Sequence, residues 1–289
     1  MRTLFFLLLF LPLVAWSQLN DDFSDGEILN NPTWLGDLSL FKVNSNFQLQ
    51  LNQLNPLSNN ITYLSAFSGI TDSLEWNFSI RLAFSPSDDN KARVYLLADK
   101  SDLTQSLNGY FLQFGEALSN DAIELFYQQG TQIQSICRGT NARIASAFDI
   151  DIKVIHKKNG NWSVFVDWNK TGNFVLECSG QSISNISNPY FGFLCRYTSS
   201  NATKFYFDNV KVNHIYVDTE APKVASVDVI SPTELRIIFN EAVDVVSAGN
   251  TQNYLIQQTN QRPTNVTLNT AKPAEVVLKF DNSFTANIN

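Results

Sequence analysis

Pairs of carboxylates two residues apart are the first candidates for chemistry in this sequence. On a β-strand, residues i and i+2 point to the same face, so two such acids could flank a glycosidic bond and cleave it. Asp25 and Glu27 have this spacing, as do Asp149 and Asp151, which alternate with isoleucines. We interpret Asp149 and Asp151 as part of the solvent face of an ordinary strand.

The E-x-D-x-x-E pattern of β-sandwich glycosidases is not found at the glutamates of this chain. No acid stands two residues after any of these four: Glu75, Glu116, Glu124 and Glu177. The two histidines, His156 and His214, have no motif around them and are interpreted as surface residues, and there is no G-x-S-x-G nucleophile motif. The sequence therefore predicts a protein that is not an enzyme.

Three cysteines leave one thiol unpaired in any pairing scheme. Cys178 and Cys195 share their strand faces with large apolar residues and are expected to point inward, whereas Cys137 has only Ile133 and Ser135 on its side. We favour free, buried thiols over a Cys178–Cys195 disulfide. Zinc is excluded because neither C-x-x-C nor H-x-x-x-H occurs.

Exposed aromatic side chains could bind sugars by stacking on the apolar faces of saccharide rings. Trp162 and Trp168 lie on a continuous apolar stripe and are therefore assigned to the core. Trp34 and Tyr190 each stand beside a proline in a turn-like segment. They are the candidate ligand-binding residues.

The composition limits the classes of partner. The chain has 289 residues, of which 44% are hydrophobic and only 16% charged, and its net charge is −7. An acidic balance without a basic run argues against nucleic acid or anionic lipid as the main partner. The many aromatic residues supply enough apolar area for a folded core, and 32 asparagines fit a polar but weakly charged surface.

The N-terminus has the pattern of an export signal. Arg2 is followed by an apolar run from Leu4 to Val14, and small residues stand at Ala15 and Ser17. This run is shorter than the roughly 20 residues that a membrane-spanning helix needs. We expect residues 1–17 to be a signal peptide cleaved after Ser17, no transmembrane segment in the mature chain, and a secreted or outer-surface location.

The rest of the chain alternates with a period of two. Trp76, Phe78, Ile80 and Leu82 illustrate the pattern, which is typical of strands with one buried face. Asn159-Gly160 between two alternating runs predicts a hairpin. Further strands are expected in these segments: 94–97, 110–114, 123–127, 150–155, 162–168, 174–176, 191–195 and 205–212. About a dozen strands in this length predict an all-β, two-sheet jelly roll.

Three segments of residues 18–217 resemble the concanavalin-like jelly-roll module of Bacteroidetes surface proteins. They are DDFSDG…NPTWLGDLSLFKVN, SLNGYFLQFGE and YFGFLCRYTSSNATKFYFDNVKV. We expect the first acidic segment to lie beside the last strand. The resemblance implies a structural Ca²⁺ ion that joins the two, with these candidate ligands: Asp21, Asp22, Asp25 and Asp208. An acidic turn with a capping aspartate is the alternative interpretation.

Residues 218–289 resemble a bacterial Ig-like domain of the S-layer type. The matching segment is DTEAPKVASVDVISPTELRIIFNEAVDVVSAGNTQNYLI, after a proline-containing boundary. About five strands are expected where such a sandwich of about 100 residues has seven, so the second domain is expected to be truncated. Unpaired strand edges would make it labile.

Together these features predict an exported, non-catalytic protein that acts in adhesion or ligand binding. Polysaccharide or cell-surface components are the expected partners, and nucleic acid is not. The alternative is the binding or targeting part of a larger secreted enzyme whose catalytic domain lies beyond residue 289. Concanavalin-like modules serve several roles, so the resemblance itself does not choose between these.

Overall fold

Two compact units make up the chain, residues 1–216 and 217–289. The structure is a computed structural model that describes residues 19–69, 73–183, 186–187, 189–215 and 220–284. The expected signal peptide, residues 1–17, lies outside the described residues. No helix within the described ranges is long and apolar enough to span a bilayer.

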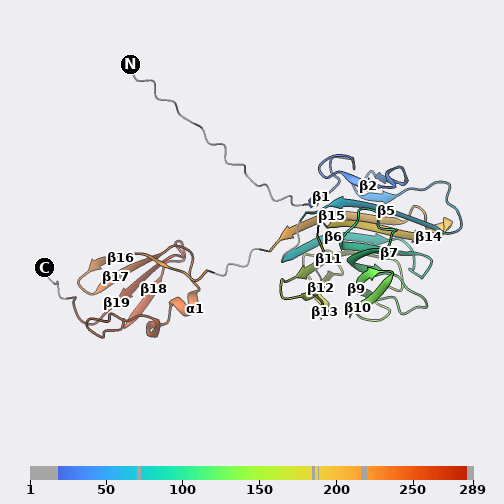
Figure 1. The fold of residues 1–289 in the computed structure, drawn as a ribbon. Helices are drawn as coiled ribbons and strands as arrows, with labels where there is room; N and C mark the ends of the chain where they lie inside the picture. Colours follow the sequence, from blue (N-terminus) through green and yellow to red (C-terminus); the bar gives the residue numbers. More distant parts are fainter. Residues whose placement is uncertain (1–18, 70–72, 184–185, 188, 216–219, 285–289) are drawn as a thin grey trace, which may run out of the picture. The chain divides into compact units, whose positions relative to one another are not determined.

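The first unit is a sandwich of two antiparallel sheets (Figure 1). The eight-stranded sheet contains, in spatial order, β13 (Val175–Gln181), β12 (Asn161–Asp167), β11 (Phe148–His156), β6 (Leu74–Leu82), β15 (Phe205–His214), β4 (Leu49–Leu51) and β3 (Phe41–Val43), with β1 (Leu19–Asp21) also paired to β15. The seven-stranded sheet contains β10 (Gln132–Arg138), β9 (Ile123–Gly130), β8 (Leu107–Phe114), β7 (Lys91–Ala98), β14 (Tyr190–Tyr197), β5 (Asn60–Phe67) and β2 (Trp34–Gly36). Two 3-10 turns, Leu38–Leu40 and Ser199–Asn201, complete this unit's described elements. The predicted all-β, two-sheet architecture is confirmed.

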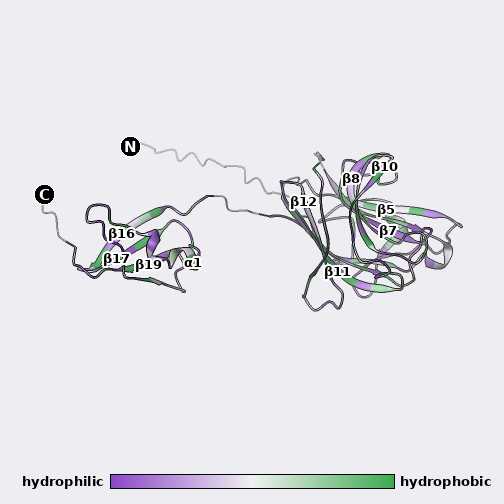
Figure 2. Cartoon of the chain, turned by 90° about the horizontal axis from the view of Figure 1, so that it is seen from below, coloured by the Kyte–Doolittle hydropathy of each residue, from purple (hydrophilic) through white to green (hydrophobic). Residues whose placement is uncertain are grey.

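Alternation along each strand explains the sandwich. In β11, buried residues alternate with partly exposed ones, and Figure 2 shows both hydrophobic and hydrophilic residues along this strand. The buried sides meet in one core, where Phe193 of one sheet stacks on Phe207 of the other with ring centroids 4.0 Å apart. Tyr110 and Trp162 form a second contact between the sheets, at 4.5 Å. Aromatic pairs of this kind add about 0.5–1.5 kcal/mol to the burial of their apolar area.

Two local predictions about pairing are confirmed. The hairpin of β11 and β12 turns through residues 157–160, and Gly160 takes a φ of +85°, which glycine adopts without the cost that a Cβ would bring. The acidic N-terminal segment begins as β1, whose Leu19 and Asp21 lie opposite Val212 and Val210 of β15.

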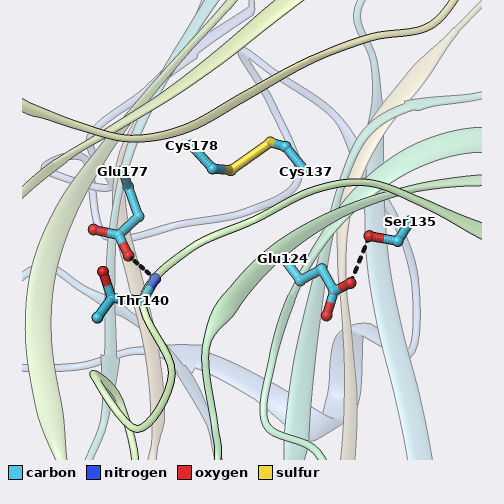
Figure 3. The surroundings of a disulfide bond; sticks show 6 residues. All are labelled: Glu124, Ser135, Cys137, Thr140, Glu177 and Cys178. Atoms are coloured by element: carbon cyan, nitrogen blue, oxygen red, sulfur yellow. Dashed lines mark hydrogen bonds between the residues drawn. A yellow bond between two sulfur atoms is a disulfide. The ribbon is translucent and has the colours of Figure 1, made fainter.

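A disulfide joins the two sheets at their edges. Cys137 of β10 is bonded to Cys178 of β13, and Cys195 is a free, buried thiol. Figure 3 shows the bond between these edge strands. The strands approach so closely that a Cβ at position 180 would collide with the carbonyl oxygen of Ile136, which is why glycine is needed there. The favoured expectation of free, buried thiols is confirmed for Cys195 and wrong for Cys137 and Cys178, and the alternative, a Cys178–Cys195 bridge, is wrong as well.

A β-bulge is the reason that Cys137 was not predicted to be bridged. Ser135 lies opposite Phe126, but Cys137 lies opposite Leu125, so one extra residue is inserted between them. This insertion turns Cys137 to the inner face, although strict alternation from Ile133 and Ser135 would turn it outward. The bulge thus brings Cys137 within bonding distance of Cys178.

The second unit is smaller. Its sheet has the order β16 (Val224–Ser231), β17 (Glu234–Phe239), β19 (Glu275–Lys279) and β18 (Asn265–Leu268), and it carries the short helix α1 (Val245–Ala248) and a 3-10 turn at Thr251–Asn253. Its buried core consists of Ile237, Ala248, Val276, Leu278 and Phe280. Within residues 220–284 the chain forms four strands, one fewer than expected.

The disulfide gives a direct test of how the sheets are held together. The bonded cysteines are 41 residues apart, and a loop of that length stabilises a fold by about 4 kcal/mol through the entropy of the unfolded chain. We expect Cys137→Ala/Cys178→Ala to lower the Tm by about 10 °C. Reductant should lower the Tm of the parent chain but not that of the double variant.

Alkylation in denaturant checks the pairing itself. Without reductant one thiol should be labelled, that of Cys195, and after reduction three should be labelled. Three labels without reductant would contradict the disulfide.

Candidate functional site

A pocket opens on the outer face of the seven-stranded sheet, the face turned away from the core. It has a volume of about 220 Å³ and is formed by β5, β7, β9, β14 and the loop of residues 99–106. The polar residues lining it include Lys91, Arg93, Tyr95, Thr104, Gln105, Gln128 and Arg196. We call it the Arg93 pocket.

Strand register places these side chains. Leu194, Arg93, Gln113 and Glu124 are successive Cα partners across β14, β7, β8 and β9, so they form one row on the outer face. Neighbouring members of such a row are about 4.8 Å apart in the sheet. The row two residues along consists of Gly192, Tyr95, Phe111 and Phe126. Polar groups therefore lie beside an apolar row.

The loop of residues 99–106 covers that apolar row. Leu103 is 2% exposed and packs on Tyr95 and Phe111. Leu103 also lies over Gly192 of β14, where glycine is required because a Cβ would lie 2.4 Å from the carbonyl oxygen of Leu64 on the neighbouring strand. The Ser65 hydroxyl also donates a hydrogen bond to the carbonyl oxygen of residue 101, at 2.7 Å. The loop is thus anchored to the sheet.

Asp102 fixes the rim of the pocket. Its carboxylate accepts hydrogen bonds from the backbone NH and the hydroxyl of Thr104, at 2.9 and 2.6 Å, and from Nε2 of Gln105, at 2.9 Å. These bonds hold the pKa of Asp102 below its usual value. Thr104 and Gln105 are therefore held in place before any ligand arrives.

The floor of the pocket is polar and buried. The Tyr95 hydroxyl donates to Oε1 of Gln128 at 2.8 Å, and Nε2 of Gln128 donates to the carbonyl oxygen of Gly130 at 2.9 Å. Burial raises the pKa of Tyr95, so this hydroxyl stays protonated at neutral pH. The floor is therefore a fixed hydrogen-bonding surface rather than a titrating one.

Arg93 differs from the other cations of the pocket. Lys91 pairs with Asp88, and Arg196 pairs with Asp89 at 2.9 Å. The Nε of Arg93 donates to Oε1 of Gln113 at 3.0 Å, and its guanidinium lies 4.6 Å from the ring centroid of Phe111. Among the described residues, no carboxylate forms an ion pair with Arg93. Its guanidinium also interacts with the hydroxyl of Tyr95, so Arg93 is part of the polar lining of the pocket.

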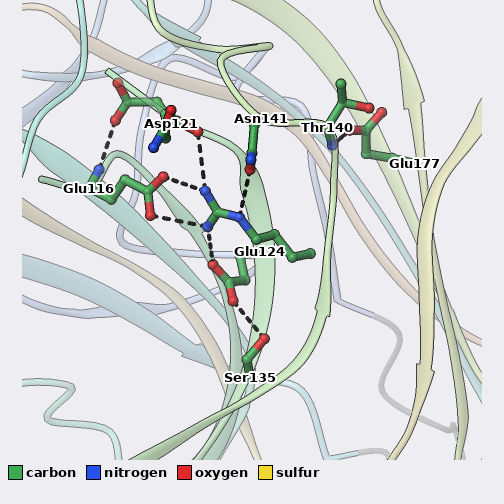
Figure 4. A network of polar contacts seen from close by, with 9 residues as sticks. Glu116, Asp121, Glu124, Ser135, Thr140, Asn141 and Glu177 are labelled. Atoms are coloured by element: carbon green, nitrogen blue, oxygen red, sulfur yellow. Dashed lines mark hydrogen bonds and ion pairs between the residues drawn. The ribbon is translucent and has the colours of Figure 1, made fainter. Parts of the chain in front are cut away.

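The row that contains Arg93 ends in a network of ion pairs. Arg138 of β10 pairs with Glu116 and Glu124, and it also donates to the side chain of Asn141 (Figure 4). Glu124 accepts a further hydrogen bond from the hydroxyl of Ser135 at 2.6 Å. The two glutamates raise the pKa of Arg138. Arg138 thus neutralises Glu124, the carboxylate of this row.

Trp34 is a correction to the sequence analysis. It was predicted to be exposed, but it is fully buried, and its Nε1 donates to Oδ2 of Asp21 at 2.7 Å. The edge strand β2 pairs with β5 so that Trp34 faces the core and stacks on Phe193 at 5.5 Å. Its ring face cannot meet a sugar in this structure.

Tyr190 lies outside the pocket. It is half-buried near the end of β14 and packs edge-on against Phe67, with ring centroids 5.6 Å apart. The structure therefore does not bring Trp34 and Tyr190 together. A ligand-binding role for Tyr190 stays a prediction.

The predicted calcium ligands mostly bond to their own chain segment. Asp21 accepts from the indole of Trp34 and from the backbone NH of Phe23, while Asp22 and Asp25 accept from backbone NH groups two residues on. Within the described ranges, no group of three or more acidic, histidine or cysteine side chains is arranged to hold a metal ion. These hydrogen bonds agree with the alternative interpretation, an acidic turn, and a Ca²⁺ site at these residues stays a prediction.

Asp208 is the unusual member of this set. Burial raises its pKa to about 6, and the carboxylates of Asp22 and Asp151 act in the same direction. Its carboxylate accepts a hydrogen bond from the backbone NH of Asn209 at 2.8 Å. The raised pKa means that the folded protein binds a proton here more readily than the unfolded chain.

The carboxylate pair on β11 is neutralised by a lysine. Nζ of Lys170 lies 2.7 Å from Asp149 and 3.5 Å from Asp151, and Asp151 also accepts from the hydroxyl of Ser79 at 2.6 Å. This arrangement agrees with a solvent-facing strand rather than with a hydrolytic pair. His156, in contrast, was wrongly expected at the surface: it is buried and stacks on Trp162 at 4.2 Å.

Comparisons with known proteins bear on the fold alone. No protein-family model matches the sequence, and no curated protein matches it. The carbohydrate recognition domain of Emp47p is similar in structure, with 14% identity, a TM-score of 0.51, and coverage of 70% of this chain and 96% of that domain. The legume lectin-like domain from Entamoeba histolytica is similar with 12% identity, a TM-score of 0.50, and coverage of 65% and 92%. This chain therefore contains a β-sandwich with the fold of legume-lectin-like carbohydrate recognition domains.

Proposed function

We propose that the protein binds carbohydrate in the Arg93 pocket and is non-catalytic. The observation that carries this proposal is the lining of the pocket, where two guanidinium groups, one ammonium group, two side-chain amides and two hydroxyls surround apolar groups. Saccharides offer many hydroxyl groups together with apolar ring faces. A site that binds them therefore needs hydrogen-bonding side chains as well as apolar ones. The pre-fixed rim and floor reduce the entropy that would be lost on binding.

The fold supports the same proposal. Both structural neighbours described above are named as lectin-like or carbohydrate recognition domains. Their identities with this chain are too low to transfer a binding site, so the residues proposed here come from the pocket itself.

The location and the second unit complete the proposal. We propose that residues 1–17 direct export, so that the pocket acts outside the cytoplasm in adhesion or ligand binding. We further propose that the sheet of β16–β19 is an Ig-like spacer, on the basis of the sequence resemblance and of its antiparallel pairing. Polysaccharide or cell-surface glycan is the proposed partner.

Substitution of Arg93 tests the pocket. We expect Arg93→Gln to weaken glycan binding by about tenfold or more, because a charge-assisted hydrogen bond is worth about 1.5–3 kcal/mol. Arg81→Gln is the matched control, since Arg81 also lies over an aromatic ring, 3.6 Å from the centroid of Tyr206, but on the other sheet. The measurement is a glycan array with the chain from residue 18 onward, followed by titration of the hits. A chain that binds no glycan, or equal losses in the two variants, would contradict the proposal.

The raised pKa of Asp208 predicts how stability depends on pH. The unfolded carboxyl ionises near 3.8 and the folded one near 6, so the folded state is penalised as the pH rises from about 4 through 6. Solvent screens part of this penalty because Asp208 is only half-buried. We expect Asp208→Asn to raise the Tm by about 2–4 °C at pH 7.5 and to leave it unchanged near pH 3.5.

The same variant decides whether calcium is needed. Because the acidic side chains mostly bond to their own chain segment, EDTA and added Ca²⁺ should leave the Tm of the parent chain unchanged. A Tm that rises with Ca²⁺ in the parent chain and not in Asp208→Asn would instead support the calcium site suggested by the sequence.

A further inference from the structure

Two larger hollows lie on the outer face of the other, eight-stranded sheet. One has a volume of about 460 Å³ and is lined by residues of β11, β12 and β13, among them Ile155, Ser163 and Ser179. The other, of about 450 Å³, is lined by residues of β6, β11 and β15, among them Glu75 and Asn213. Nothing in the proposed function uses this face.

Strand register shows that the two hollows share one row of residues. Ser179, Ser163, Ile155, Glu75 and Asn213 are successive Cα partners across β13, β12, β11, β6 and β15. Five strands at about 4.8 Å spacing span about 19 Å. Ile155, which lines the first hollow, lies opposite Glu75, which lines the second, so the two hollows are neighbours along this row. We call this combined feature the cross-strand groove.

An apolar edge runs beside the groove. A register shift after Val164 places Leu176 opposite Phe165 on the outer face, and Leu176 is 55% exposed. Phe165 and Phe174 flank the ammonium group of Lys153, which lies 5.2 and 4.8 Å from their ring centroids. Phe174 also lines the second hollow. The groove therefore offers aromatic carbon as well as polar groups.

The charges of the groove cancel. Its lining holds two carboxylates, Glu75 and Asp151, and two ammonium groups, Lys157 and Lys211. The remaining polar lining consists of amides and hydroxyls, and Nδ2 of Asn77 donates to Oε1 of Glu75 at 2.8 Å. A polyanion such as nucleic acid would need an excess of cations here. Charge complementarity thus favours an uncharged ligand rich in hydrogen-bonding groups.

We propose that the cross-strand groove is a second binding site, which holds a linear, uncharged polysaccharide chain across the strands of the eight-stranded sheet. The length of the groove suits an extended chain rather than a single sugar, and the phenyl group of Phe174, which lines the second hollow, supplies an apolar contact. The site is separate from the Arg93 pocket, which lies on the other sheet, so either site can exist without the other.

The test uses native electrophoresis of the chain from residue 18 onward in gels that contain neutral mannan, glucan or xylan. We expect at least one of these polymers to retard the parent chain, and Phe174→Ala/Asn213→Ala to weaken that retardation about tenfold. Asn173→Ala is the matched control, because Asn173 is exposed next to Phe174 but does not line either hollow. Equal Tm values for all variants exclude a folding defect.

Two further measurements separate the sites. Arg93→Gln should leave the retardation unchanged, and titration with neutral oligosaccharides should show affinity rising with chain length until the ligand spans about 19 Å. Two results would contradict the proposed groove site. One is that no neutral polymer retards the parent chain, and the other is that Arg93→Gln abolishes the retardation while Phe174→Ala/Asn213→Ala does not. Light scattering gives the remaining check: a dimer that Phe174→Ala/Asn213→Ala dissociates would mean that a second copy of the chain covers this face, which would also overturn the proposal.

Discussion

Each sheet of the first unit buries one face against the other, and this packing constrains where a binding site can form. Residues that alternate along a strand have only two directions, and the inner one is filled by a continuous apolar cluster. Functional side chains must therefore stand on the two outer faces or in the loops at the strand ends. Register then decides which of them are neighbours, and this is how Arg93, Gln113 and Glu124 come to form a row although they are far apart in the sequence.

Much of this framework could be predicted from residue types alone. Strands such as β6 and β11 and the Asn159-Gly160 turn follow from alternation and local turn chemistry, whereas the pairing of β1 with β15 was expected together with the jelly-roll resemblance. The disulfide could not be predicted in the same way. It depends on a bulge in β10 between Ser135 and Cys137, which reverses the direction of the side chains that follow in this strand. The residue types in this segment do not indicate where such an extra residue is inserted.

The candidate site was missed for a related reason. Leu103 and Gln105 lie in a loop whose position depends on packing against Tyr95 and Phe111 and on a hydrogen bond from Ser65, 36 residues before residue 101. The prediction for Trp34 was wrong in the opposite sense, because a residue expected to be exposed is buried. A tryptophan near a proline suggests an exposed turn, but the edge strand β2 pairs with β5 and turns the indole toward Asp21 and Phe193. Local sequence cannot report such long-range pairing, whereas the burial of a continuous stripe such as Trp162, Val164 and Val166 is visible in it.

Two binding faces on opposite sheets would allow one molecule to hold two polysaccharide chains. The core between them is a continuous apolar cluster, packed as closely as protein interiors are. A short saccharide cannot reach both faces at once, because the sandwich lies between them, and no gain from effective concentration arises on a single short chain. Separate polysaccharide chains could instead be held on the two faces of one molecule. Bridging of this kind would suit an adhesive role better than a catalytic one, since it depends on two independent contacts and needs no reaction at either.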